Sequence, residues 1–510
     1  MKKRNVLLVG GLMAVLACGA QQINPLTMAV INSYTELISA NPNDYMSYLQ
    51  RGQEYLNLGD MQKAEEDLLN ALKFTPEKET DLRSQEYSLL SDIYLTRGEN
   101  EKALDALTTA LKADPNSYAI RYKLGRLYLT LDRPDDAYRT FQGLQNLKSR
   151  SQEAYYGMAQ AAARLGKTQE AVDLIEQIKN ADQNSFVTYL RIGNVYEDLN
   201  QNDKAAANYL RSYSLSNKNS SPLDALMALA SKDYQAVASA LDSNIKAAPT
   251  NIMLHYLKSF VALENGNYND AIREGNELLL LPDGQDASVY RLLAISYQAL
   301  GNQSAALESI NKAAAMDPND PLVLIEQIDM TMNSDPKAAA AIADKALAAN
   351  GSNLDLMMEA AKANIMARNG EKARDILNTI VMTDPSNVES LVLRGYVNTE
   401  LLDDAKTGIN DYTRASNIDA ADNYNKIYKA LAKVKAGKVM DADSIITGIA
   451  NSDPDAQTLY YLAAYYAQTG NLEKAKETAD KAVAKGYSNV FNLKQNKAPM
   501  LNLQPIHHLF

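Results

Sequence analysis

Residues 84–115 read SQEYSLLSDIYLTRGENEKALDALTTALKADP, and this stretch decides the fold. Tyr87, Leu90 and Tyr94 are separated by three and then four residues, the spacing of one apolar face of a helix. A glycine then marks a turn, a second apolar stripe follows, and Pro115 ends it, because proline cannot continue a helix. The stretch therefore predicts two helices joined by a tight turn and closed by a proline.

The pattern recurs along most of the chain with a period of 34 residues. Pro42 and Pro76 close successive copies 34 residues apart, whereas Pro115 follows Pro76 by 39 residues, so five residues are inserted near 77–81. Glycine returns at the turn, at Gly59, Gly98, Gly166, Gly266, Gly301, Gly437 and Gly470. Alanine returns in the second helix, at Ala64, Ala103, Ala137, Ala171, Ala205, Ala271, Ala306, Ala373 and Ala475. A fixed period of this size is typical of stacked supersecondary units rather than of one closed core.

The recurring glycine and alanine each have a physical reason. A helix that ends in a left-handed residue favours glycine, so we predict positive φ angles at the turn. Alanine lets two helices approach closely, and a larger side chain would overpack the crossing. The chain has one cysteine, Cys18, so disulfides do not hold the repeats together and burial between helices must do so.

The succession of aromatic or Leu, Leu-Gly/Ala, Tyr, Ala, aromatic or aliphatic residue, Ala and Pro resembles the tetratricopeptide repeat. The resemblance covers roughly residues 24–487 and implies an all-α fold. It implies an α-solenoid superhelix of about 13 tetratricopeptide-like helix-turn-helix repeats after a half-repeat that ends at Pro42. In the copy at 388–420, Tyr412 and Ala415 are shifted by one residue. The resemblance is specific for the fold and weak for function, because such repeats serve many unrelated systems.

Composition divides the chain into five expected segments. The run Ser216–Pro222 is a polar, helix-breaking stretch between two blocks of repeats. The expected segments are a signal peptide at 1–20, an N-terminal repeat block at 21–215, a polar loop or hinge at 216–222, a C-terminal repeat block at 223–488 and a capping tail at 489–510.

The first twenty residues have the layout of an export signal. Basic residues at 2–4 precede an apolar run at 6–17 that is too short to span a bilayer. Cleavage between Ala20 and Gln21 would release a soluble protein. Alternatively, residues 15–18 resemble the lipobox of bacterial lipoproteins, which implies a lipid anchor on Cys18. No later segment is apolar enough to span a membrane, so we expect an exported protein, periplasmic or associated with the outer membrane.

The charge balance argues against nucleic acid as a partner. The chain has 51 basic and 62 acidic residues, a net charge of −11, and loss of the basic residues at 2–4 would make it −14. An acidic surface repels phosphate backbones. Residues 121–150 are a local exception, with seven basic residues against three acidic ones. A solvated helix face and a site for an acidic partner both account for them.

The sequence offers no recognisable catalytic or metal-binding constellation. Of three histidines, His255 lies where other copies carry a core tyrosine, and the adjacent His507 and His508 do not converge on one metal ion. Nucleophile elbows, phosphate loops and zinc-protease motifs are absent from the sequence. We therefore expect no enzyme activity, no cofactor, no metal and no small-molecule substrate.

The resemblance also implies a binding surface. In the resembled family the first helices line a concave groove that binds extended peptides, through the second, fifth, ninth and twelfth positions of each unit. Transferred to this sequence, these positions predict a partner-binding site with aromatic and amide side chains. Its residues are Tyr122, Arg126, Tyr156, Gln160, Asn194 and Glu197.

The sequence thus favours a non-catalytic scaffold or adaptor of the bacterial cell envelope that binds a protein segment in its groove. The alternative is a glycan-binding envelope protein resembling the SusD family, whose members combine such repeats with loops that carry aromatic platforms. This chain has no tryptophan and no long insertion, which disfavours the alternative.

Overall fold

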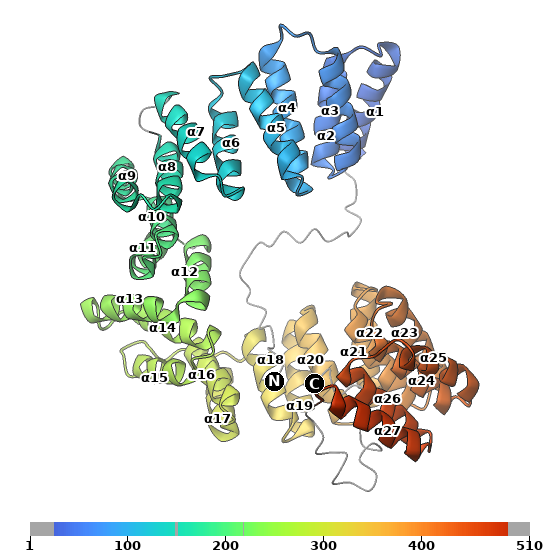
Figure 1. The fold of residues 1–510 in the computed structure, drawn as a ribbon. Coiled ribbons are helices and arrows are strands. Elements are labelled where there is room, and N and C mark those ends of the chain that lie inside the picture. Colours follow the sequence, from blue (N-terminus) through green and yellow to red (C-terminus); the bar gives the residue numbers. More distant parts are fainter. Residues whose placement is uncertain (1–24, 148–150, 218, 488–510) are drawn as a thin grey trace. The chain divides into compact units, whose positions relative to one another are not determined.

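A computed structural model describes residues 25–147, 151–217 and 219–487 (Figure 1). These residues form 27 α-helices and one π-helical turn, with no strand among them. The chain divides into two compact units, Met1–Pro249 and Thr250–Phe510, which we call unit 1 and unit 2. The expected signal peptide, Cys18 and the expected tail at 489–510 lie outside the described residues.

Unit 1 is a single helix followed by six helical hairpins, since each even-numbered helix packs against the odd-numbered helix that follows it. We call these the first and second helix of a hairpin. The helices are α1 (Pro25–Ala40), α2 (Tyr45–Asn57), α3 (Met61–Phe74), α4 (Thr80–Thr96), α5 (Asn100–Ala113), α6 (Tyr118–Thr130), α7 (Pro134–Leu147), α8 (Gln152–Arg164), α9 (Thr168–Ala181), α10 (Phe186–Asp198), α11 (Asn202–Leu215), α12 (Ser221–Lys232) and α13 (Tyr234–Ala247).

Unit 2 consists of seven further hairpins of the same kind. Its helices are α14 (Ile252–Glu264), α15 (Tyr268–Leu279), α16 (Ala287–Ala299), α17 (Gln303–Met316), α18 (Pro321–Met332), α19 (Pro336–Asn350), α20 (Leu354–Met366), α21 (Gly370–Thr383), α22 (Val388–Tyr396), the π-turn η1 (Val397–Leu401), α23 (Ala405–Ile418), α24 (Asn423–Lys435), α25 (Val439–Ala450), α26 (Ala456–Gln468) and α27 (Leu472–Ala484). The all-α solenoid class and the count of thirteen repeats after a half-repeat are confirmed.

The turns inside the hairpins follow the sequence pattern. All seven turn glycines have positive φ angles, between 72° at Gly166 and 84° at Gly470, as predicted. In four other hairpins the same position holds Asp132, Asn200, Arg368 or Asp403, with φ angles of 53°, 55°, 59° and 57°. Asp and Asn tolerate this conformation better than other side chains, whereas an arginine there is strained. The turn geometry is thus kept even where glycine is absent.

Close helix packing explains the small residues. The recurring alanines are buried, with exposed fractions of 0 to 4%. In unit 1, the ring of Phe141 lies between two glycines, and a Cβ atom added at Gly157 would come within 2.5 Å of it. Likewise, a Cβ atom at Gly193 would come within 2.3 Å of Tyr209 Cε1. An aromatic side chain on the second helix therefore needs a glycine opposite it.

Both irregularities of the period have a local structural cause. The insertion near 77–81 is taken up at the start of α4, which has 17 residues where α2 and α6 have 13. The one-residue shift of Tyr412 is taken up by η1, where the Leu402 amide donates to the Val397 carbonyl at 3.0 Å. A π-turn adds one residue without ending the helix, so the downstream contacts stay in place.

The expected loop lies inside unit 1, between the end of α11 at Leu215 and the start of α12 at Ser221. Its action as a hinge stays a prediction. In the described part of the chain, no helix combines the length and apolar character needed to cross a membrane.

Candidate functional site

The predicted site residues lie on three consecutive first helices of unit 1, namely α6, α8 and α10. Equivalent positions on neighbouring first helices are about one repeat apart in sequence, so their side chains meet across the stack. Polar pairs of this kind link α4 to α6, α6 to α8, α8 to α10, and α10 to α12. Lys123 on α6, for example, reaches Asp92 on α4 with Nζ–oxygen distances of 2.7 and 2.8 Å.

Gln160 connects α6 to α10. Its Oε1 accepts a hydrogen bond from Arg126 Nη1 at 2.9 Å, and its Nε2 donates to Asp198 Oδ2 at 3.1 Å. The Gln160 side chain is 7% exposed, so both ends of its amide are held in place. Arg164 Nε lies 3.6 Å from the other oxygen of Asp198, Oδ1.

Asn194 and Glu197 are joined through a buried tyrosine. Asn194 Nδ2 donates to the Tyr156 hydroxyl at 2.9 Å, which links α10 to α8. The Tyr209 hydroxyl on α11 lies 2.8 Å from both Asn194 Oδ1 and Glu197 Oε2. Tyr209 is 1% exposed and its ring packs against Gly193. The packing of the ring in the core therefore fixes the position of its hydroxyl.

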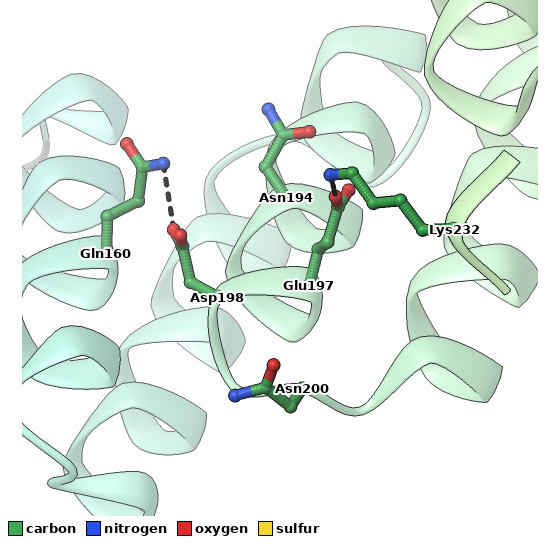
Figure 2. Close-up of a pocket in the computed structure, with 6 residues that line it drawn as sticks. All are labelled: Gln160, Asn194, Glu197, Asp198, Asn200 and Lys232. Atoms are coloured by element: carbon green, nitrogen blue, oxygen red, sulfur yellow. Dashed lines mark hydrogen bonds and ion pairs between the residues drawn. The ribbon is translucent and has the colours of Figure 1, made fainter. Parts of the chain in front are cut away.

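Lys232, at the end of α12, completes the arrangement by pairing with Glu197 Oε1. We call Arg126, Gln160, Asn194, Glu197, Asp198 and Lys232 the polar network. Figure 2 shows five of these residues together with Asn200, and the six drawn residues line an open pocket with a volume of about 440 Å³. The Gln160–Asp198 and Lys232–Glu197 interactions lie on its two sides.

Burial changes the acidity of several groups at the site. It raises the pKa of Asp198, because a carboxylate is less well solvated there than in water. Burial also raises the pKa of the Tyr156 hydroxyl and, together with the hydrogen bond to Glu197, that of the Tyr209 hydroxyl. Both tyrosines therefore stay neutral at physiological pH and act as hydrogen-bonding groups.

The structure gives the two predicted aromatic residues different surroundings. Tyr122 is half-buried and packs edge-on against Phe141, with ring centroids 6.2 Å apart. Tyr156 is 9% exposed, and the guanidinium of Arg191 lies 5.6 Å from the centre of its ring. Tyr156 thus supports Asn194 through its hydroxyl and presents little aromatic surface. The other four predicted residues, Arg126, Gln160, Asn194 and Glu197, are brought together in the network.

Sequence reasoning missed Asp198, Asn200 and Lys232, which line the pocket, and Tyr209, which supports it from α11. Asp198 directly follows a predicted residue. Tyr209 lies on a second helix with its ring in the core, whereas the predicted site used first-helix positions alone. Lys232 is the last residue of α12, which has only twelve residues, so its position within the repeat could not be aligned with the other copies. Its separation of 35 residues from Glu197 matches the spacing of the other inter-repeat pairs and was the available signal.

His255 is buried, as the sequence predicted. Among the described residues, His255, Glu274 and Glu277 are the only group of possible metal ligands that lie close together. Lys258 Nζ, however, lies 2.5 Å from Glu274 Oε1 and already neutralises that carboxylate. His255, Lys258 and Glu274 thus form a buried ion-pair cluster between α14 and α15, and Glu277 beside them is exposed.

Three models of the tetratricopeptide repeat family match the chain. One matches residues 94–149 and 331–392, the second matches 47–78, 187–219 and 287–320, and the third matches 153–185. The matched segments occur in both units. Each contains all or part of at least one hairpin of the structure.

No curated protein matches the chain. Solved structures with similar hairpins include a tetratricopeptide repeat protein from Parabacteroides merdae ATCC 43184, with 18% identity, coverage of 57% of this chain and 99% of that one, and a TM-score of 0.31. YrrB, described as a TPR protein with an unusual peptide-binding site, has 18% identity, coverages of 38% and 98%, and a TM-score of 0.31. The APC/C hetero-tetramer Cut9–Hcn1 has 15% identity, coverages of 90% and 96%, and a TM-score of 0.35. The identities and TM-scores of these structures are low. The assignment to the repeat family therefore rests on the family models and on the hairpins described above.

Proposed function

The chain is a tetratricopeptide repeat protein, and we propose that it is a non-catalytic scaffold whose unit 1 binds a segment of a partner protein along the polar network. Repeats of this family are in general protein-interaction modules, and stacked hairpins present an extended surface. The observation that carries the proposal is a pair of adjoining hydrogen-bonded sets that together extend from α6 to α12. One set is built on Gln160 and Asp198 and the other on Asn194, Tyr209 and Glu197. The two sets adjoin at the end of α10, where Glu197 and Asp198 are consecutive residues.

Preorganisation is the physical reason for this choice of site. The side chains of Gln160 and Asn194 each make hydrogen bonds to two other residues, so a partner does not need to immobilise them. A rigid surface loses less conformational entropy on binding than a flexible one. Amide side chains can both donate and accept, which suits the alternating N–H and C=O groups of an extended backbone.

The glycan-binding alternative lacks a supporting observation. Sugar recognition by aromatic stacking requires an exposed ring face, and at Tyr156 the ring is buried with Arg191 beside it. Tyr122 uses part of its ring to pack on Phe141. These two positions therefore support a polypeptide ligand better than a glycan.

We also propose that the protein is exported and acts in the bacterial envelope, either soluble after cleavage between Ala20 and Gln21 or anchored through Cys18. The support is the basic start and short apolar run at residues 2–17. Cell fractionation with mass spectrometry of the mature N-terminus tests this. Recovery of the intact chain, with Met1, from the cytoplasm would contradict export.

Cross-linking capture of partners from native envelopes tests the binding proposal. The test variant replaces Gln160, Asn194 and Glu197 by alanine, and the control replaces Gln169 and Asn208, on the second helices α9 and α11, by alanine. We expect the test variant to lose the partners of the parent protein and the control to keep them, with unchanged circular dichroism for both. Equal capture by all three proteins would reject the site.

A further inference from the structure

The chemistry of the pocket indicates what kind of side chain it receives. Its six lining residues comprise two carboxylates, three amides and one ammonium group (Figure 2). Carboxylates only accept hydrogen bonds, whereas each amide has one acceptor oxygen and one donor nitrogen and the ammonium group only donates. Two oxygens on each carboxylate and one on each amide make seven acceptor oxygens, against four donor nitrogens. A ligand group rich in N–H donors therefore finds more partners here than a carboxylate would.

The position of the two carboxylates strengthens the negative potential. Glu197 and Asp198 are the last two residues of α10. The carboxyl end of a helix carries a partial negative charge from its unpaired carbonyl groups, so acidic side chains are disfavoured there and cations are favoured. Burial is the main cause of the raised pKa of Asp198, and the negative charge of Glu197 adds to it. A cation close to Asp198 would therefore stabilise its charged form.

The existing counter-charges leave room for a further cation. Arg164, the ion-pair partner of Asp198, is 3.6 Å away and uses Nη1 to donate to the Leu129 carbonyl at 2.5 Å. Arg126 reaches Gln160 at Oε1, the end of that amide that does not contact Asp198. Asp198 is thus contacted at hydrogen-bonding distance by a neutral amide, with its cationic partner farther away.

Lys232 already shows that an ammonium group fits the pocket. Its side chain is 66% exposed and reaches Glu197 from the neighbouring repeat. Exposed ion pairs of flexible lysines contribute little free energy, so such a contact is easily exchanged. Glu197, by contrast, is held by the buried Tyr209 and stays in place when the lysine leaves.

We propose that the pocket receives an arginine or lysine side chain of the partner segment, which takes the place of Lys232 on Glu197 and also contacts Asp198. Lys232 is then an intramolecular competitor for the site. This inference rests on the proposed function, because it names the chemistry that the same surface recognises.

Panning a library of random twelve-residue peptides against the full chain tests the proposal. Peptides that bind the parent but not the Gln160, Asn194 and Glu197 triple-alanine variant are kept, and we expect arginine and lysine to be enriched among them. For one such peptide, Glu197→Gln with Asp198→Asn should weaken binding at least tenfold, since charge-assisted hydrogen bonds are lost. Lys232→Ala should strengthen binding several-fold, because it removes the competitor.

Lys204→Ala, on the exposed side of α11, is the matched control for the loss of one positive charge, and it should leave the affinity unchanged. Enrichment of acidic peptides, or weaker binding by Lys232→Ala, would overturn the proposal while leaving a protein-binding surface intact. Site-dependent peptides without a charge preference would also reject it. If no peptide depends on the triple-alanine positions, the proposed function itself fails, and this inference fails with it.

Discussion

Arg394 on α22 and Asp411 on α23 form a bidentate ion pair inside their hairpin, with Nε–Oδ2 and Nη2–Oδ1 distances of 3.0 and 2.6 Å. Arg51 and Asp67 form the same pair between α2 and α3, with both distances 2.7 Å. The residues of the first pair are 17 apart in sequence and those of the second are 16 apart. The extra residue in the first pair is the one that η1 accommodates, so the π-turn preserves this contact.

Removing one partner of the Arg394–Asp411 pair should be strongly destabilising. The Asp411 side chain is 5% exposed, and Asp411→Ala would leave a largely buried guanidinium without its counter-charge. We expect a loss of about 3 kcal/mol in the free energy of unfolding, measured by urea denaturation. Glu308→Ala, which breaks an exposed pair with Lys312, should leave the free energy of unfolding nearly unchanged. Equal effects of the two changes would contradict the assigned burial.

The left-handed turn at Arg368 should be improved by glycine. Its φ of 59° is unfavourable for a residue with a Cβ atom. Arg368→Gly should therefore stabilise the protein by about 1 kcal/mol, whereas Gly301→Arg, at the equivalent turn with a φ of 77°, should destabilise it by a similar amount. Thermal denaturation of both variants measures the effect. The melting temperature should rise for Arg368→Gly and fall for Gly301→Arg, and shifts of the same sign would contradict the prediction.

Enlarging a crossing alanine should overpack the core. Ala306 is fully buried on α17, and Ala306→Leu should cost about 1–3 kcal/mol. Ala315→Leu places the same side chain on the exposed side of the same helix and should change stability little. An unchanged melting temperature for Ala306→Leu would argue against the tight crossing.

Glu86 should make stability depend on pH. It is fully buried, burial raises its pKa, and its Oε2 has no hydrogen-bond partner among the described residues. The Thr75 hydroxyl lies 2.6 Å from Glu86 Oε1 and 2.8 Å from the Ala71 carbonyl, although it has only one proton to donate. The Thr75 hydroxyl therefore cannot fully compensate the buried carboxylate, and burial remains the main cause of the raised pKa of Glu86.

Because the folded protein holds the Glu86 proton more tightly than the unfolded chain, this residue costs stability as the pH rises above its ordinary pKa of 4.5. Glu86→Gln should therefore be more stable than the parent at pH 7 and equal to it at pH 4. Urea denaturation at both pH values measures the difference. A constant difference would show that the charge of Glu86 is not responsible.

Gly193 should control the geometry of the polar network. Gly193→Ala would place a Cβ atom against the Tyr209 ring and push its hydroxyl away from Asn194 and Glu197. We expect partner binding to fall about tenfold or more, in addition to a loss of stability. Tyr209→Phe, which keeps the ring and removes only the hydroxyl, separates the two effects. It should weaken partner binding while the ring packing persists.

The sequence by itself determined the elements of this protein. Helix periodicity, turn glycines and terminal prolines are local signals, and they predicted thirteen hairpins after a half-repeat. They also located the inserted residues near 77–81 and the one-residue shift at Tyr412. Four of the six predicted site residues lie in one network because equivalent positions of neighbouring repeats face each other.

Only the tertiary structure decided how those side chains meet. Pairs such as Lys232–Glu197 and Gln160–Asp198 join residues 35 and 38 positions apart, and they depend on the packing of one hairpin on the next. The burial of Tyr156 has the same origin, because a first helix is flanked by both neighbouring repeats and its exposed stripe is narrow. A period in the sequence specifies which helix follows which, whereas the packing between helices decides which atoms remain at the surface.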